Sequence, residues 1–381
     1  MRKIKAIERK HSKLEKIYIG NGLGAGDRRR KRKVLSQPVR AVDTAGINSI
    51  VGLVDAYKGM SIQARLIGQC AEVYENMLLD KTRPTVFLGL AGPLIAGGLR
   101  KVIRDMVAYG IVDVIVSTGA ILYQDLYQAL GYNHYKGTAD ADDAILRDLL
   151  INRIYDTYVD DEKFVKTDTW VGEFASSLEP RAYSSREFLS LLSREIKDDE
   201  SILKTAAKYN VPIFSPALND SSIGIGLTDH YYLAKKSHQE KVIIDSIRDN
   251  YELTQIMIKS KKTAAAYIAG GVPKNFINDA VVMGYIFGKN TGGHSYAFQL
   301  TTDVPHWGGL SGSTLDEAKS WGKINKKAAK AMAFVEPTVS LPLVAGYVIQ
   351  KKVWKGRPRL KFRWEGDTLE EFSINRKNKV K

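Results

Sequence analysis

The chain has 381 residues, 44% of them hydrophobic and 26% charged, as is ordinary for a globular protein with a substantial core. Its net charge of +15 is uneven: residues 1–33 hold 13 basic and 3 acidic side chains, residues 351–381 hold 11 and 4, and the segment between is near neutral. The single cysteine, Cys70, excludes an internal disulfide framework and suits a reducing cytoplasm.

Several other classes are also disfavoured. No apolar run approaches the ~20 residues of a membrane span, and the N-terminus is charged throughout, so neither a membrane helix nor a secretory signal is predicted. The six histidines are scattered and Cys70 has no partner, so no metal site is predicted. The basic tails are typical of arms that bind an acidic partner or nucleic acid, or of ends that only aid solubility.

The first 35 residues are interpreted as a basic, flexible arm. Residues 20–25 (GNGLGA) formally fit a dinucleotide-binding fingerprint, but a block of basic residues follows where an amphipathic helix is required. We expect one α/β domain over residues 36–350 and a basic extension over residues 351–381.

The first half of the domain predicts helices and parallel strands. Apolar residues at helical spacing over residues 47–79 predict two helices broken near Gly59-Met60-Ser61. A strand is predicted at Thr85–Leu90, a helix at Leu99–Tyr109 and a second strand at Val112–Val116. This unit indicates a doubly wound, mostly parallel Rossmann-like sheet, in which ligands collect at the carboxyl ends of the strands.

The middle of the chain is less regular. Residues 137–200 show no clear strand pattern; helices are predicted at Ala141–Ile154 and Ser185–Ile196, with an irregular excursion around Trp170 between them. A strand at Val211–Phe214 then leads into the polar segment SPALNDSS, which by itself predicts a turn.

Three more strands follow a helical stretch at Lys241–Lys261. They are predicted at Thr263–Ala269, Tyr296–Leu300 and Met332–Val335, and a helix opened by Lys274 follows the first of them. A last helix is predicted at Val339–Lys351. Glu336 follows the final strand, where a carboxylate can accept hydrogen bonds from ribose hydroxyl groups.

The segment WGGLSGSTLDEAKSWGKI, residues 307–324, carries the strongest chemical signal. A glycine-rich loop precedes a helix predicted from Thr314, and this helix brings Glu317, Trp321 and Lys323 within seven positions. A lysine beside an indole is partly desolvated, which favours its neutral, nucleophilic form, and such an amine can form imines. The alternative from spacing alone is an amphipathic helix with a solvated Lys323.

This segment resembles the signature of the deoxyhypusine synthase family, in which a DEA turn precedes the catalytic lysine of an SWGK tetrapeptide. Here the matching residues are 316–318 and 320–323, and the resemblance extends from about Ser36 to Lys351. It implies the family's NAD-binding fold and a homotetramer. It also implies a reaction in which a polyamine, spermidine, is oxidised and its aminobutyl group passes through an imine on the lysine to a translation factor lysine (initiation factor 5A type).

The resemblance also implies site residues. Lys323, Trp321 and Glu317 match the catalytic set, and Ile62-Gln63-Ala64 resembles a recurring family element. The expected NAD-contacting residues follow the predicted strands; they are Gly92, Pro93, Leu94, Thr118, Gly119, Ala120, Asp220, Ser222, Gly270, Gly271, Thr301, Thr302, Gly308 and Glu336.

Three positions expected to bind the amine depart from the family pattern. Ile225 and Leu310 stand where the family has acids, and Asn275 stands where it has a histidine. Losing two carboxylates weakens a site for a polycation, since each charge-assisted hydrogen bond is worth roughly 1.5–3 kcal/mol. The sequence therefore leaves open an ordinary deoxyhypusine synthase, a related enzyme with another donor or acceptor such as a homospermidine-type synthase, and a non-catalytic NAD-binding paralogue.

Overall fold

The computed structural model describes Ile17 and residues 22–379, and the chain divides into two compact units, residues 1–42 and 43–381. In the first unit, α2 (Ala25–Val34) contains the basic block and has no buried side chain. The block is therefore helical, in a segment that the sequence was interpreted to form as a flexible arm. Gly20 and Asn21 of the formal fingerprint, and most of the expected flexible arm, lie outside the described residues.

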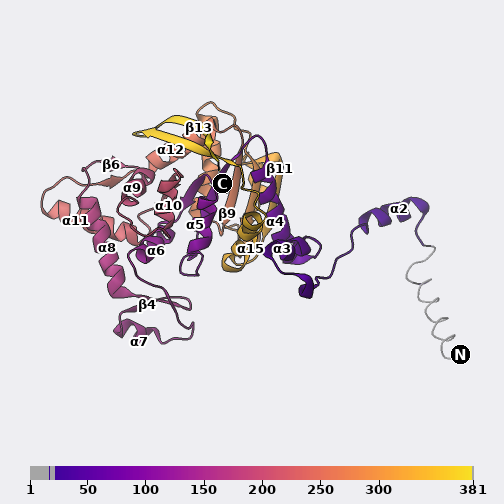
Figure 1. The fold of residues 1–381 in the computed structure, drawn as a ribbon, viewed down its shortest axis with the longest axis horizontal. Coiled ribbons are helices and arrows are strands. Elements are labelled where there is room, and N and C mark those ends of the chain that lie inside the picture. Colours follow the sequence, from indigo (N-terminus) through magenta and orange to yellow (C-terminus); the bar gives the residue numbers. More distant parts are fainter. Residues whose placement is uncertain (1–16, 18–21, 380–381) are drawn as a thin grey trace. The chain divides into compact units, whose positions relative to one another are not determined.

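The second unit is built on a six-stranded sheet in which every neighbouring pair is parallel. The spatial order is β11-β10-β9-β1-β2-β7. Figure 1 labels β9 and β11 of this sheet, with helices around them. The strands are β1 (Thr85–Leu90), β2 (Val114–Ser117), β7 (Ile213–Phe214), β9 (Thr263–Ile268), β10 (His294–Leu300) and β11 (Ile324–Ala333). The chain winds outward from β1 in one direction and from β9 in the other, which confirms the doubly wound α/β fold.

Side-chain alternation along the strands builds a core on each face of the sheet. Along β1, Val86 and Leu88 join one buried cluster and Phe87 joins the other, as the two-residue period of a strand requires. Strands buried on both faces read as continuous apolar runs. This is why the central strands were predicted correctly.

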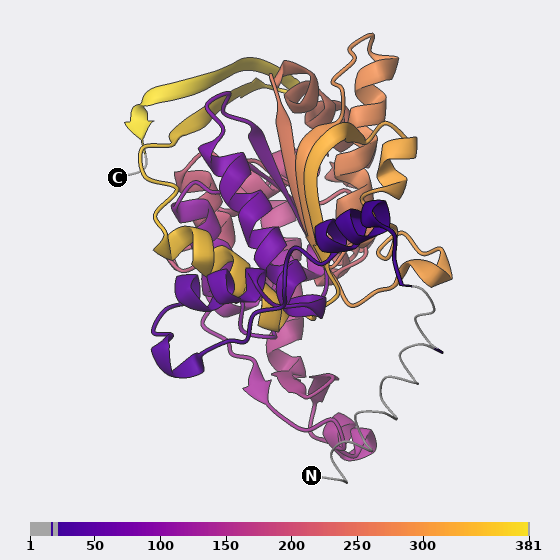
Figure 2. The same cartoon turned by 90° about the vertical axis from the view of Figure 1, so that its right-hand side faces the viewer.

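Helices cover both faces (Figure 2). One cluster includes side chains from α3 (Ile50–Lys58), α4 (Ile62–Leu79), α5 (Arg100–Ala108), α6 (Gly119–Ala129), α10 (Ile202–Lys208) and α15 (Pro337–Gln350). The other includes side chains from α12 (Ser246–Lys259) and α13 (Gly271–Ile286). The predicted break between α3 and α4 is confirmed. Cys70 is packed in the first cluster, and burial raises the pKa of its thiol.

The expectation for residues 137–200 is wrong in three places. Ile151–Ile154 is strand β4, paired with β5 (Thr157–Asp160), which in turn pairs with β3 (Tyr135–Lys136); the predicted helix shrinks to α7 (Asp143–Asp148). Trp170 lies in a regular helix, α8 (Asp161–Ser176). The β4–β5 turn places Tyr155 at a φ of 57°, so the glycine or asparagine that usually marks such a turn is missing.

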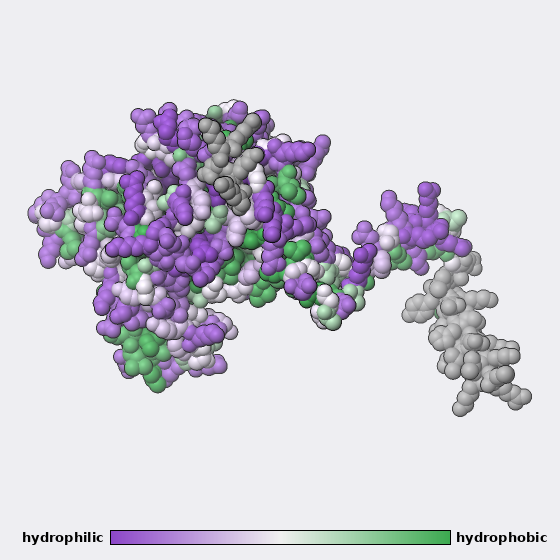
Figure 3. All heavy atoms as spheres, in the orientation of Figure 1, coloured by the Kyte–Doolittle hydropathy of each residue, from purple (hydrophilic) through white to green (hydrophobic). Residues whose placement is uncertain are grey.

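Four further elements belong to the part of the chain between residues 182 and 244. A pair of two-residue strands, β6 (Ala182–Tyr183) and β8 (Ile243–Ile244), accompanies α9 (Ser185–Leu192) and α11 (Ser222–Lys236). Exposed apolar side chains gather over α7, at the lower left of Figure 3; they are Ile145, Leu149 and Leu150.

The C-terminal extension is an antiparallel hairpin of β12 (Pro358–Glu365) and β13 (Thr368–Lys379), whose side chains Leu360 and Phe362 join the second core cluster. Its anchor is buried: the Asp113 carboxylate accepts from Arg83 at 2.7 Å and from Arg357 at 2.9 Å. One basic side chain of this extension, Arg357, is therefore buried in an ion pair and does not contribute its charge to the surface.

Within residues 22–379, no helix is long and apolar enough to cross a membrane.

Candidate active site

The carboxyl ends of β1 and β9 lie together at the point where the winding direction reverses. The Ala91 amide donates to Ile268 O at 3.1 Å, so the two loops leave the sheet side by side. The first loop contains Gly92, at a φ of 86°, with Pro93 and Leu94, and the second contains Gly270 and Gly271. In the first loop Gly92 and Pro93 are exposed, whereas the side chain of Leu94 is buried.

The loops after β2 and β7 pack closely beside them. A Cβ added to Gly119 would lie 2.3 Å from Ser221 Oγ, which brings Thr118, Gly119 and Ala120 against the segment of Asp220 and Ser222. The Asp220 side chain is exposed. The sequence-predicted cofactor residues on these two loops are therefore neighbours.

The start of α15 joins the same edge. A Cβ on Gly97 would lie 2.7 Å from Thr338 Cγ2, so the loop after β1 contacts this helix. Glu336 caps the helix and accepts from the Thr338 amide at 2.7 Å. This oxygen is engaged by the backbone, which leaves the other oxygen of the carboxylate for a ligand.

Thr301 and Thr302 follow β10 directly, and Gly308 ends the short η2 (Pro305–Trp307) at a φ of 67°. Two hydrogen bonds from the Gln299 side chain, called the Gln299 clasp below, connect the following loop to the end of β9. Gln299 donates from Nε2 to Ala269 O at 2.7 Å and to Ser311 O at 2.8 Å.

Ala269 adopts a φ of 58°, a left-handed conformation that is costly for a residue with a Cβ. Its neighbour Gly270 has no room for one, because a Cβ there would meet Ser311 Cα at 2.6 Å. The Gly271 amide donates to Ser311 Oγ at 2.9 Å. The turn after β9 and the glycine-rich loop are thus locked to each other.

Lys274 is the buried cation of this region and is only 1% exposed. Its Nζ donates to Ser313 O at 2.7 Å, to Ser313 Oγ at 3.0 Å and to Leu310 O at 3.1 Å. Burial lowers its pKa to about 8, although the carboxylates of Glu317 and Asp303 counteract this effect. Lys274 therefore fixes the loop that leads to Glu317.

Lys323 does not lie in a helix, contrary to the sequence-based expectation. Helix α14 spans only Glu317–Ser320. The Gly322 amide donates to Lys319 O and the Lys323 amide to Ala318 O, both near 3 Å, with Gly322 at a φ of 72°. This is a Schellman ending. It places Lys323 directly before β11, which begins at Ile324 and not at Met332.

The Lys323 amine meets two side chains of α13. Its Nζ lies 3.0 Å from Asp279 Oδ1 and 3.3 Å from Asn275 Oδ1, and Asn275 Nδ2 donates to Asp279 Oδ2 at 2.8 Å. Asn275 and Asp279 are one helical turn apart, so both face the lysine. The Lys323 side chain is 15% exposed, so it is largely shielded yet reachable.

Trp321 and Glu317 complete the expected catalytic set. The Lys323 Nζ lies 5.6 Å from the centre of the Trp321 ring, which is within cation–π range, and the ring itself is 67% exposed. Glu317 and Thr314 exchange hydrogen bonds in a capping-box pattern, with 3.0 Å from the Glu317 amide to Thr314 Oγ1. Trp321 therefore lies beside Lys323, while Glu317 begins the short helix α14 that leads to them and its carboxylate influences the neighbouring Lys274.

The three residues expected to bind the amine do not all lie near Lys323. Asn275 contacts Lys323 directly, and the Leu310 carbonyl contacts Lys274. Ile225 lies on α11 beyond β7, at the opposite edge of the sheet from β11 (Figure 1). Six strands imply an edge-to-edge distance of roughly 24 Å, so one copy of the chain does not bring Ile225 to Lys323.

Reasoning from the sequence missed Asp279, Lys274 and the Gln299 clasp. The i, i+4 spacing of Asn275 and Asp279 on a predicted helix was the available signal for the first. No group of three or more histidine, cysteine, aspartate or glutamate side chains within the described residues could hold a metal ion.

Comparisons with known proteins identify the family of this chain. The model of the family described as deoxyhypusine synthase matches residues 52–348. The chain belongs to the deoxyhypusine synthase family. The matched segment contains all six strands of the main sheet, and it contains Lys323 with its contacts Asn275, Asp279 and Trp321. The C-terminal hairpin lies beyond it.

Some relatives are named probable deoxyhypusine synthases, and others are named deoxyhypusine synthase-like proteins. The chain is 42% identical to "Probable deoxyhypusine synthase 2" of Methanosarcina acetivorans, covering 84% of this chain and 92% of the relative. It is 43% identical to a "Deoxyhypusine synthase-like protein" of Chlorobaculum tepidum, covering 87% and 95%. A crystal structure of a "putative deoxyhypusine synthase from Entamoeba histolytica" shares the fold, with a TM-score of 0.56, 19% identity, and coverage of 82% of this chain and 97% of that one. Membership of this family indicates a transferase.

Proposed function

We propose that the protein is an NAD-dependent aminoalkyl transferase that carries the transferred group as an imine on Lys323. The observation that carries the proposal is the shielded Lys323 amine, 3.0 Å from the Asp279 carboxylate and bordered by Trp321. A structural surface lysine needs neither this shielding nor two side chains aimed at its nitrogen.

The carboxyl edge of the sheet suits a dinucleotide. Gly119 and Gly270 lie where a Cβ would clash with a neighbouring loop, and the free amide groups at the start of α6 can receive phosphate oxygens. At the start of α13 the Gly271 amide already donates to Ser311 Oγ, so that helix offers fewer free donors. When bound, NAD would take a hydride from the carbon that bears the donor nitrogen, which turns a C–N single bond into an imine. Asp220 and the free oxygen of Glu336 would accept from ribose hydroxyl groups.

Lys323 then attacks the imine carbon. The new bond joins Lys323 Nζ to that carbon, the bond to the original donor nitrogen breaks, and the departing fragment leaves as an amine. Nζ must lose its protons during this exchange, and Asp279 Oδ1 is the carboxylate oxygen placed to accept one. Attack by a second primary amine displaces Lys323 as a free amine and leaves an imine between the transferred group and the acceptor. Return of the hydride held by the reduced cofactor would convert this imine into a secondary amine, so the whole transfer involves no net oxidation.

The donor is a polyamine or related amine that carries fewer positive charges than spermidine, the family's donor. Leu310 offers no charge, and Asp316 already pairs with Lys319 and Lys330 at 2.9 Å each. Asp279 and Glu317 remain as acids near the lysine. Burying an ammonium without a partner costs several kcal/mol, which disfavours the longer polycations. The acceptor is a primary amine, either a protein lysine such as that of an initiation factor 5A-type protein or a free diamine.

The complete site needs a second copy of the chain. Asp220, Ser222 and Ile225 lie toward the β7 edge and Lys323 at the β11 edge, so an arrangement that uses all of them joins two subunits. A homotetramer built from such dimers is consistent with the family.

The proposal is tested by incubating the protein with NAD and a panel of amines, namely spermidine, putrescine, cadaverine and diaminopropane, followed by mass spectrometry. We expect an NAD-dependent transfer product, and a diamine acceptor would give a longer polyamine. Binding of NAD without any product from the panel or from a lysine-bearing acceptor protein would favour the non-catalytic paralogue.

A further inference from the structure

A hollow of about 250 Å³ lies between α9, α10 and strand β12 of the C-terminal hairpin. It reaches Ile213, at the beginning of β7, so it opens at the amino edge of the sheet, whereas the candidate active site occupies the carboxyl edge. Two of its walls, Phe362 and Trp364, come from the hairpin, which lies beyond the segment matched by the family. This site is therefore separate from the transferase machinery.

The floor and walls of the hollow are apolar. They are formed by Leu189, Leu203, Ala206, Ile213 and Phe362, with Trp364 at one side. Apolar surface of this kind binds the hydrophobic body of a ligand, while a few polar groups fix its orientation.

The polar groups around the hollow are mainly hydrogen-bond donors, and among its described lining residues none is acidic. Arg194 is exposed and pairs with no carboxylate within the described part of the chain. Asn210 Oδ1 accepts from the Phe362 amide at 2.7 Å, which leaves its NH₂ group for another partner. A carboxylate suits these donors, whereas an ammonium would be repelled.

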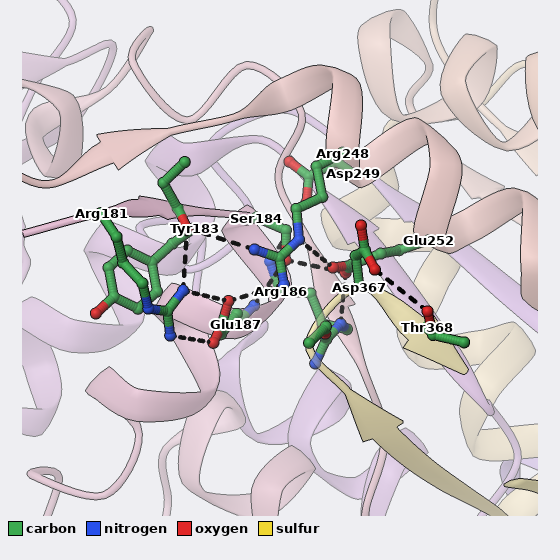
Figure 4. A network of polar contacts seen from close by, with 12 residues as sticks. Arg181, Tyr183, Ser184, Arg186, Glu187, Arg248, Asp249, Glu252, Asp367 and Thr368 are labelled. Carbon is green, nitrogen blue, oxygen red and sulfur yellow. Dashed lines mark hydrogen bonds and ion pairs between the residues drawn. The ribbon is translucent and has the colours of Figure 1, made fainter. Parts of the chain in front are cut away.

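Arg186 provides a second, buried guanidinium and is 8% exposed. Its Nε pairs with Glu252 Oε2 at 2.6 Å, and its guanidinium carbon lies 4.1 Å from the centre of the Trp364 ring (Figure 4 shows the ion pair). It also donates to the Gly366 carbonyl in the hairpin turn at 3.2 Å. Arg186 thus holds Trp364 in place as a wall.

We propose that this hollow binds a small aromatic carboxylate, with its ring between the apolar floor and Trp364 and its carboxylate toward Arg194 and the amide of Asn210. The preference for an anion distinguishes this ligand from the amines that the active site takes. The two sites can therefore be examined independently.

The test uses the full chain and isothermal titration with benzoate, cinnamate and naphthoate. We expect one saturable site per chain for at least one probe, and binding of cinnamyl alcohol, the neutral match of cinnamate, at least about tenfold weaker because a charge-assisted hydrogen bond is lost. Arg194→Gln should weaken the carboxylate by a similar factor. Lys208→Gln removes the same charge from α10 outside the hollow and should leave affinity unchanged.

Two further variants block the cavity without altering charge. Ala207→Phe and Ser190→Phe place a ring into the hollow from exposed positions of α10 and α9, and either one should abolish binding while circular dichroism remains that of the parent. No saturable binding of any probe to the parent would overturn the proposal. So would equal affinity in the parent and a folded blocking variant, since the probe would then bind elsewhere.

Discussion

Asp279 and Lys323, 44 residues apart in the chain, form an ion pair with 3.0 Å between Oδ1 and Nζ. The pair joins the middle of α13 to the residue that precedes β11. In this position the carboxylate can steady the ammonium, accept its proton during imine formation, and bind the nitrogen of an incoming amine once the lysine has reacted.

Asp279→Asn should therefore reduce turnover. The amide preserves shape and one hydrogen bond but cannot accept a proton, and loss of a general base costs about 10²-fold or more in rate. Steady-state kinetics of the transfer reaction should show the loss mainly in kcat. Asp316→Asn makes the same chemical change at a carboxylate paired with surface lysines, and its kcat should stay within about twofold of the parent. An unchanged kcat in the Asp279 variant would show that this carboxylate is not the proton acceptor.

A mixing experiment tests whether sites are shared between subunits. Lys323→Ala should be inactive in transfer alone, and Asp220→Ala, which weakens NAD binding, should be nearly inactive when NAD is well below its dissociation constant for that variant. After dissociation and reassociation of a mixture, random pairing should restore roughly a quarter of the parent sites, because each hybrid dimer of a twofold-symmetric pair has one intact site. Activity that stays at zero in verified hybrids would place the whole site within one chain.

Gly119→Ala tests the close packing of the β2 and β7 loops. The new Cβ would meet Ser221 Oγ at 2.3 Å and its Cβ at 2.7 Å, so the loop must shift. Overpacking of this kind costs about 1–3 kcal/mol. We expect weaker NAD binding by calorimetry and a lower free energy of unfolding in urea. The control is Gly24→Ala, where nothing lies within 4 Å of the added Cβ and neither quantity should change.

The buried Asp113 pair controls the attachment of the hairpin. Two guanidinium groups, those of Arg357 and Arg83, hold the pKa of its carboxyl well below its ordinary value, against the effect of burial. Because the folded pKa is depressed, this stabilisation is complete above the unfolded pKa, near 4, and is lost as pH falls through the folded value.

Asp113→Ala should accordingly lower the free energy of unfolding by about 3–5 kcal/mol at neutral pH, since two buried arginines lose their partner. Urea denaturation at neutral and acidic pH measures this, and the difference from the parent should shrink in acid. Glu371→Gln, at an exposed pair with Lys361, should change the same quantity by less than about 1 kcal/mol. A similar effect in both variants would contradict the anchoring role.

The central strands could be predicted because their signals are local, and the proposed catalytic residues were inferred from a signal that is equally local. An apolar run such as Thr85–Leu90 is buried on both faces, and Glu317, Trp321 and Lys323 are close in sequence. The helix end at Gly322 also had a local signal, since glycine is the usual residue at the left-handed position that ends a helix, but the sequence-based expectation extended the helix to Lys323.

Other features depend on contacts between distant segments. Nothing near Lys323 in the sequence identifies Asp279 as its partner, and the turn at Tyr155 lacks its usual residue. The basic extension was predicted from charge alone, but Arg357 finds Asp113 more than 240 residues earlier, which only the folded chain reveals.

The most direct measurement is borohydride reduction of the protein incubated with NAD and a reactive amine from the panel, followed by peptide mass spectrometry. Reduction converts an imine into a stable secondary amine, so the proposed intermediate predicts a mass increase on the peptide that contains Lys323, dependent on NAD and absent from Lys323→Ala. The Lys323→Ala variant should still bind NAD, because the lysine is not proposed as a cofactor ligand. A stable adduct on Lys274 or another lysine instead, or transfer that continues undiminished in Lys323→Ala, would contradict a covalent role for Lys323.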